Sequence, residues 1–61
     1  MIDLRLERIA RGMTQSDLAE RAGVSQAYIA MIERGKRKPG LKLIRRLSDV
    51  LSIPAVDFLE D

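Results

Sequence analysis

The sequence contains no cysteine and no histidine, so disulfide bonds are impossible and the commonest zinc ligands are missing. Without these residues the serines have no obvious general base, and the sequence shows no glycine-rich phosphate loop. Only 3% of the residues are aromatic, and no window approaches the ~20 apolar residues that a membrane-spanning helix needs. These absences argue against an enzyme, a metal site, a bound cofactor and a membrane protein.

A chain of 61 residues makes one domain at most, and we expect a single domain over residues 1–61. Such a domain buries only ~60% of the surface that its unfolded chain exposes, so it is marginally stable alone. Since disulfides and zinc are excluded, a partner subunit is the remaining stabiliser. Asp3, Arg5 and Arg8 interrupt any apolar run near the N-terminus, so no secretion signal is visible and we expect a cytoplasmic protein.

The charged residues are unevenly distributed, although the formal net charge is only +2. Residues 34–46 include seven basic side chains and no acidic one, whereas residues 49–61 include four acidic side chains and no basic one. A cationic edge of this kind suits a phosphate-bearing partner. An ordinary solvated basic loop has the same composition and stays an alternative.

Apolar residues recur at helical spacing along the chain, and no stretch alternates as a half-buried strand would. Glycine and proline divide the chain into pieces that are too short to be stable helices separately. We therefore predict an all-α, compact five-helix bundle. Its helices are expected at about residues 3–11, 15–22, 26–34, 41–51 and 54–59.

The same spacing predicts the helix ends and the inward-facing side chains. Thr14 and Asp17 are placed to form a capping box, and Ser25 is placed to cap the next helix. Gly12 and Gly23 are expected to end the helices that precede them. The predicted inner faces consist of Leu6, Ile9, Ala10, Met13, Leu18, Ala19, Ala22, Ile29, Ile32, Ile44, Leu47, Ser48, Leu51, Phe58 and Leu59.

Residues 14–36 carry the most informative pattern. Two predicted helices meet across a turn of about three residues, Gly23–Val24–Ser25, as in a helix-turn-helix. The small Ala19 lies where the helices cross, and Gly23 supplies the positive φ that a tight turn needs. The space between the helices is filled by Leu18, Val24, Ile29 and Ile32.

With the stretches RIARGMTQSDLAERAGVSQ, IERGKRKP and SIPAVDFL, the chain resembles the helix-turn-helix family of phage Cro and repressor proteins, the XRE-like family. The resemblance runs from Leu4 to Leu59. It implies a lambda-repressor-like DNA-binding domain that docks its third helix into the major groove. It also implies a sequence-specific regulator of transcription, of bacterial or phage origin, with double-stranded DNA as its partner.

The outward side of the predicted helix 26–34 suits a groove in DNA. Ile29 and Ile32 face the core, which leaves a small, partly apolar stripe outside that matches thymine methyl groups. The amide of Gln26 matches N6 and N7 of adenine. Met31 has an alternative role, packing against a partner subunit or a neighbouring helix. We assign base reading to Gln26, Ala27, Met31 and Arg34.

Contacts to phosphate are expected on both sides of this helix, and they position a protein without selecting a sequence. Gln15 begins a helix, where free amides and the positive end of the dipole attract an anion. In the resembling family, the glutamine at this place grips the DNA backbone. Ser25 and Tyr28 can donate hydroxyl groups. The basic candidates are Lys36, Arg37 and Lys38.

Arg8 and Glu33 are predicted to form a structural ion pair. Glu33 lies in the last turn of its helix, where the dipole disfavours an acid, and the family resemblance places Arg8 opposite it. If the pair is buried, losing one partner costs about 3–5 kcal/mol. The alternative is two exposed charges worth ~0–1 kcal/mol.

A second copy of the chain is expected to bind the second half of the DNA site. Two-fold dimers place their reading helices about 34–36 Å apart, one turn of DNA. Leu43 and Val50 lie off the core face of the predicted helix 41–51, and with Ala55 and Val56 they make a self-complementary apolar patch. Alternatively, Leu43 and Val50 merely broaden the core.

The leading interpretation is a repressor that binds a pseudo-palindromic operator as a homodimer. Antitoxins and controllers of restriction–modification operons share this fold, and the sequence does not choose among them. A protein-interaction module that has lost DNA binding is a further alternative, against which the basic residues 36–38 and the pair Gln15 and Gln26 argue. A protein partner such as a toxin or a polymerase is left open.

Overall fold

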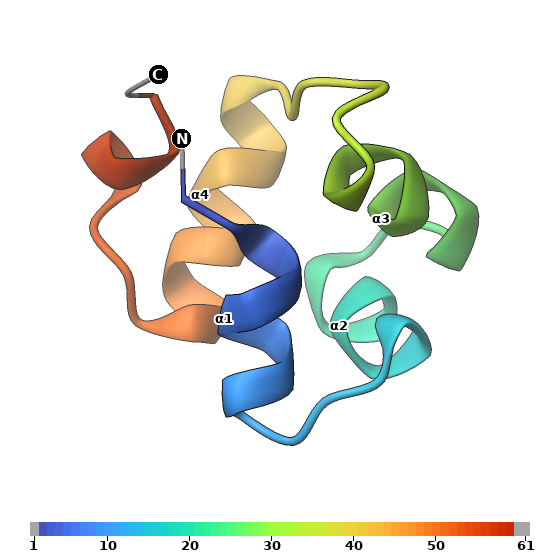
Figure 1. Ribbon diagram of the computed structural model, residues 1–61. Helices are drawn as coiled ribbons and strands as arrows, with labels where there is room; N and C mark the ends of the chain where they lie inside the picture. The colour runs from blue at the N-terminus through green and yellow to red at the C-terminus, as the bar shows by residue number, and fades with distance from the viewer. Residues whose placement is uncertain (1, 60–61) are drawn as a thin grey trace.

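The computed structural model describes residues 2–59, which form four α-helices and a closing 3-10 turn (Figure 1). Met1, Glu60 and Asp61, which the predicted domain includes, lie outside the described residues. The elements are α1 (Leu4–Ala10), α2 (Gln15–Ala22), α3 (Gln26–Glu33), α4 (Leu41–Leu51) and the 3-10 turn η1 (Ala55–Phe58). The all-helical class is confirmed, since the described residues contain no strand.

The predicted count of five helices is not confirmed, because the described residues form four α-helices and the last element is a short 3-10 turn. Its backbone bonds join residues three apart: Asp57 N–H donates to the carbonyl of Pro54, and Leu59 N–H donates to that of Val56. Four residues are too few for an α-helix to complete its bonding pattern. Phe58 is buried as predicted, whereas Leu59 follows the turn and is exposed, contrary to prediction.

The helix pair α2–α3 and α4 form the centre of the fold, and α1 and η1 pack against them (Figure 1). α2 contacts both α3 and α4, α1 contacts α3, and η1 packs on α4. The N-terminal segment is tied to η1 by a bond from the Ile2 N–H to the Asp57 carbonyl. None of the helices described is long and apolar enough to cross a membrane.

The residues predicted for the inner faces of α2, α3 and α4 are buried, except Ser48, which is half-buried. The largest fully buried side chains are Leu18, Ile29, Ile32, Leu47 and Leu51. Burial of each such side chain contributes roughly 1.5–3 kcal/mol, which makes this cluster the main source of stability. Because three of these residues come from α2 and α3, the core holds those two helices in a fixed relation.

The inner face predicted for α1 is wrong. Leu6 is 62% exposed and Ile9 is 51% exposed, and Ala10 is also exposed. Leu4 and Arg8, one turn apart, face the interior instead. A search for apolar periodicity passes over Arg8, because a guanidinium enters a core only when its charge is paired there. The pairing partner lies far away in the sequence and is described below.

Several polar side chains fix the helix ends. The capping box of Thr14 and Asp17 is present, and the Ser25 hydroxyl accepts a hydrogen bond from the Tyr28 N–H at 3.1 Å, both as predicted. The bond from the Thr14 N–H is the main reason that the pKa of Asp17 lies below its usual value. Ser48 donates to the carbonyl of Ile53 beyond the end of α4, rather than to a carbonyl within its own helix.

Two arginines cap helix C-termini with their side chains. Arg11 donates to the carbonyl of Leu51, through Nε at 3.1 Å and Nη2 at 2.7 Å, at the end of α4. Arg46 donates to the carbonyl of Ala22, at the end of α2, at 3.3 Å. Carbonyls in the last turn have no partner within their helix, so these contacts satisfy them. Arg46 therefore has a structural role within the cationic segment.

Candidate nucleic-acid interface

The outer side of α3 is open to solvent along its whole length. Ile29 and Ile32 are buried against α2 and the core, and they hold the helix by one face only. The four residues assigned to base reading are all exposed, and no other described segment covers them: Gln26, Ala27, Met31 and Arg34. One side of α3 is therefore free, and most of its side chains are small and uncharged.

The turn between α2 and α3 is fixed by its small residues. Gly23 adopts φ of 71°, in the left-handed region, and a Cβ there would lie 2.9 Å from Nη1 of Arg46. The Val24 N–H donates to the carbonyl of Ala19 at 3.0 Å, which closes the turn against α2. Ala19 is buried between the helices, where a larger side chain would separate them. The residues of the turn thus fix the orientation of α3 relative to α2.

A cluster of polar side chains joins the beginning of α2 to the beginning of α3. The Ser16 hydroxyl donates to Oε1 of Gln26 at 3.0 Å, and Nε2 of Gln26 donates to Oε1 of Gln15 at 3.5 Å. The structure therefore brings together the predicted phosphate contact and the predicted base reader. Ser16 did not emerge from the sequence, because its contact spans ten residues and follows no helical period.

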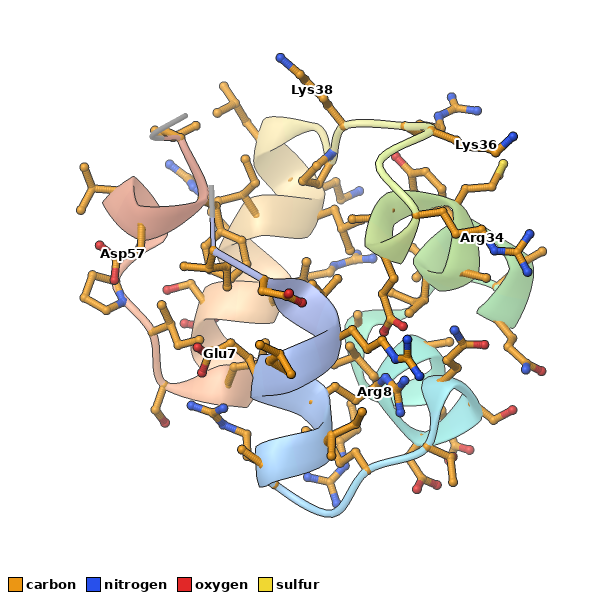
Figure 2. All side chains as sticks on the ribbon, in the orientation of Figure 1. Glu7, Arg8, Arg34, Lys36, Lys38 and Asp57 are labelled. Carbon is orange, nitrogen blue, oxygen red and sulfur yellow. The ribbon has the colours of Figure 1, made fainter. Side chains whose placement is uncertain are left out.

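The same cluster continues into a buried ion pair between α1 and α3. Nε of Arg8 lies 2.7 Å from Oε2 of Glu33, and the two side chains are only 10% and 3% exposed. A second bond joins Nη2 of Arg8 to Oε1 of Glu33 at 3.2 Å, and Nη1 of Arg8 donates to the carbonyl of Met13 at 2.8 Å. Gln15 also donates to Oε1 of Glu33, at 3.1 Å. Figure 2 shows Arg8 directed from α1 toward the α2–α3 side of the molecule.

The charges of this pair support each other. Burial favours the neutral form of Glu33, but the hydrogen bonds from Arg8 and Gln15 outweigh it and hold the pKa of that carboxyl below its usual value. The hydrogen bond to Glu33 likewise raises the pKa of Arg8. Both groups are therefore ionised at neutral pH, and Glu33 acts there only as an acceptor.

The basic segment after α3 is exposed and extends outward. Figure 2 shows Arg34 and Lys36 projecting on the α3 side, while Lys38 projects from the part of the loop nearer α4. The guanidinium of Arg37 lies 5.1 Å from the centroid of the Tyr28 ring, a distance at which cation and ring attract each other. This contact fastens the loop to α3, so its charges stand beside the exposed helix face.

Of the four residues of the predicted dimer patch, only Val56 is fully exposed in the structure. Leu43 is 6% exposed and belongs to the core, and Val50 is partly buried against that core. Ala55 is also partly buried, whereas Val56 is 54% exposed. The inner face of α4 is wide enough to take in Leu43, so this residue broadens the core. A shallow apolar groove does lie nearby, lined by Leu41, Lys42, Ile44, Arg45, Ala55 and Leu59.

Two packed helices across a tight turn, with the second helix free on one side, define a helix-turn-helix domain. Residues 4–58 match the family described as helix-turn-helix, and the chain belongs to this XRE-like family. The family resemblance drawn from the sequence is therefore confirmed.

Curated relatives are similar over most of the chain. An uncharacterized HTH-type transcriptional regulator of Bacillus subtilis, YqaF, is 34% identical over 58 residues, covering 95% of this chain and 76% of the relative. One of Methanocaldococcus jannaschii is 37% identical over 54 residues, 88% of this chain and 82% of the relative. One of Sinorhizobium medicae is 33% identical over 58 residues, and there the match spans only 42% of the relative's length.

Proposed function

We propose that the chain is a sequence-specific, double-stranded DNA-binding transcriptional regulator that inserts α3 into the major groove. The observation that carries this proposal is the open outer side of α3, opposite the buried Ile29 and Ile32. An α-helix fits the major groove, and the second helix of this motif commonly enters it. The names of the relatives, all HTH-type transcriptional regulators, support the same conclusion.

Base reading falls to the free side of α3. Gln26 stands at the first turn of the helix, where recognition helices contact base edges, and its amide pairs with adenine. Ala27 and Met31 present methyl and thioether groups that match thymine methyls. Arg34 follows the helix and carries a guanidinium that can donate to guanine O6 and N7. The stripe thus favours sites with A·T pairs under the helix and a guanine near its end.

Phosphate binding surrounds this stripe. Gln15 lies in the first turn of α2, while the Ser25 hydroxyl already accepts the Tyr28 N–H and keeps its own proton for a phosphate. The phenol of Tyr28 lies beside Arg37. Together with the N-terminus of α2, these groups flank the major groove of the DNA and fix the register of α3 in it. The charged contacts come from Lys36, Arg37 and Lys38.

We further propose a repressor that binds a pseudo-palindromic operator as a homodimer. Because Leu43 belongs to the core, the dimer surface is built from the exposed side chains around η1, with Val56 at its centre. The basic Lys42 and Arg45 line the neighbouring groove, and the acidic Asp57 lies on η1. Two copies related by a two-fold axis can therefore pair opposite charges around an apolar contact.

A selection of bound sequences from random duplex DNA tests the proposal. We expect a symmetric consensus, with half-sites about 10 base pairs apart and an adenine under Gln26 in each. Enrichment of a single, unpaired half-site would contradict the homodimer but leave sequence-specific binding intact. Binding with no enriched sequence at any salt concentration would contradict the whole proposal.

A protein-interaction module is the second candidate function, and one observation favours it. Leu6 and Ile9 are exposed three residues apart on α1, and an exposed apolar patch can mark a protein-interaction site. Salt separates the two candidates, because DNA affinity falls with a log–log slope of about −0.9 for each phosphate neutralised. A partner that binds equally well in low and high salt would favour the protein-interaction module.

A further inference from the structure

We infer that the charge of Glu33 fixes, through Gln15, the direction in which the Gln26 amide meets a base, so that Glu33 is a positioning residue for base recognition. This inference rests on the proposed function, because it assigns specificity within the same DNA site. The Glu33 side chain lies on the inner side of α3, is only 3% exposed and has no access to a base. Its influence passes through hydrogen bonds between side chains.

The first step is the direction imposed on Gln15. Glu33 is buried beside Arg8 and ionised, so its oxygens accept hydrogen bonds and cannot donate. Gln15 contacts one of those oxygens at 3.1 Å and must turn its NH2 group toward it. With the opposite amide orientation, the carbonyl of Gln15 would face a carboxylate, and two acceptors would repel each other. The carbonyl of Gln15 therefore points the other way.

The second step carries this direction to Gln26. The carbonyl of Gln15 faces Nε2 of Gln26 at 3.5 Å, so an acceptor occupies that side and Gln26 must present its NH2 group. Ser16 donates to Oε1 of Gln26 at 3.0 Å on the other side. A hydroxyl can donate or accept, so Ser16 adapts to either orientation of Gln26 and does not choose between them. The choice is made at the carboxylate.

The third step concerns what Gln26 offers to DNA. Its NH2 group keeps one free proton and its carbonyl keeps one free lone pair, so it presents a donor and an acceptor in a fixed order. Adenine offers N7 as an acceptor and N6 as a donor, whereas guanine offers acceptors at both N7 and O6. A Gln26 amide locked in one direction therefore suits adenine in one placement, and an amide free to turn accepts a wider set of bases.

Binding titrations with four duplexes test this inference, the duplexes differing only at the adenine position that the selection identifies. For the wild-type chain we expect about a 5- to 150-fold preference for adenine, the range of one good bidentate contact. In Glu33→Gln, the new amide can present either group to Gln15. We expect the preference for adenine to fall at least about threefold, with smaller changes at other positions.

Two further variants separate this effect from loss of folding or of affinity. Gln15→Ala leaves the Arg8–Glu33 pair intact and breaks the connection, so it should reduce the adenine preference as Glu33→Gln does. Lys36→Ala is the matched control, because loss of a phosphate contact should weaken all four duplexes by the same factor. If Glu33→Gln fails to fold, Gln15→Ala alone decides the result.

Nuclear magnetic resonance of the free protein supplies a readout that needs no DNA. The carboxamide protons of Gln26 should shift in Glu33→Gln, although residue 33 does not touch Gln26. An adenine preference that survives in both Glu33→Gln and Gln15→Ala would overturn this inference and leave the proposed function standing. Absence of DNA binding by the wild-type chain would overturn the proposed function, and unchanged Gln26 resonances would then overturn the connection as well.

Discussion

Arg8 and Glu33 join the first and third helices through two hydrogen bonds between side chains, at 2.7 and 3.2 Å. They lie 25 residues apart in the sequence, and their side chains are only 10% and 3% exposed. The same carboxylate also holds Gln15, at the start of α2. One ion pair therefore connects the packing of three helices with the surface proposed to bind DNA.

Removing one side of this pair should be strongly destabilising. Arg8→Ala leaves a buried carboxylate without its counter-charge, and we expect a loss of about 3–5 kcal/mol in the free energy of unfolding. The matched control is Glu7→Ala, which removes an exposed ion pair with Arg11 on the same helix and should cost ~0–1 kcal/mol. Urea denaturation measures both values. Equal losses in the two variants would show that burial does not increase the contribution of the Arg8–Glu33 pair to the free energy of unfolding.

The stability of the fold should decrease in acid. Folding lowers the pKa of Glu33, so the unfolded chain takes up its proton first as the pH falls below the ordinary value of 4.5. The stabilisation is complete above that pH and is lost progressively as the pH falls through the lower pKa of the folded state. The pKa of Asp17 is also lowered by folding, so Asp17 contributes to the loss of stability in the same direction. Between pH 7 and pH 3, the free energy of unfolding should therefore fall further for the wild type than for Glu33→Gln. An equal fall in the two proteins would contradict this assignment.

Much of the fold could be predicted from sequence, because its determinants are local. Thr14 and Asp17 are three residues apart, and their capping box depends on the chain around them alone. Ile29 and Ile32 follow the helical period, which gave the direction of α3 correctly. Gly23 marks the turn because few other residues tolerate its φ.

What the sequence did not reveal depends on contacts between distant segments. Leu6 and Ile9 have the right spacing for a core, yet α1 turns Arg8 inward because Glu33 stands opposite in the folded chain. The sequence leaves Leu43 open between a dimer patch and the core, because the width of the inner face of α4 depends on what packs against it. The hydrogen bonds that gather Ser16 and its neighbours likewise exist only once α2 and α3 are assembled.

Gln26→Ala should change specificity at one position of each half-site. Loss of the bidentate contact removes about 1–3 kcal/mol of discrimination against wrong bases, and the other positions should keep their order of preference. A repeat of the selection from random DNA measures this directly. Uniform weakening of all sequences would show that Gln26 contacts the backbone rather than a base.

Arg37→Ala should weaken binding to every sequence by a similar factor. Arg37 lies over the Tyr28 ring, beside the reading helix, and its charge is placed for a phosphate. We expect the slope of log affinity against log salt to fall in magnitude by about 1, with the base preferences unchanged. A change in the consensus sequence would place Arg37 on a base edge instead.

Val56→Asp should convert a dimer into monomers without unfolding them. Val56 is 54% exposed on η1, so its replacement leaves the core intact and puts a desolvated charge at the proposed two-fold contact. Sedimentation at micromolar concentration, alone and with operator DNA, measures the change. Leu6→Asp is the matched control, since Leu6 is similarly exposed on α1 and should leave the oligomeric state unchanged. Dissociation by Leu6→Asp but not by Val56→Asp would move the dimer surface to α1.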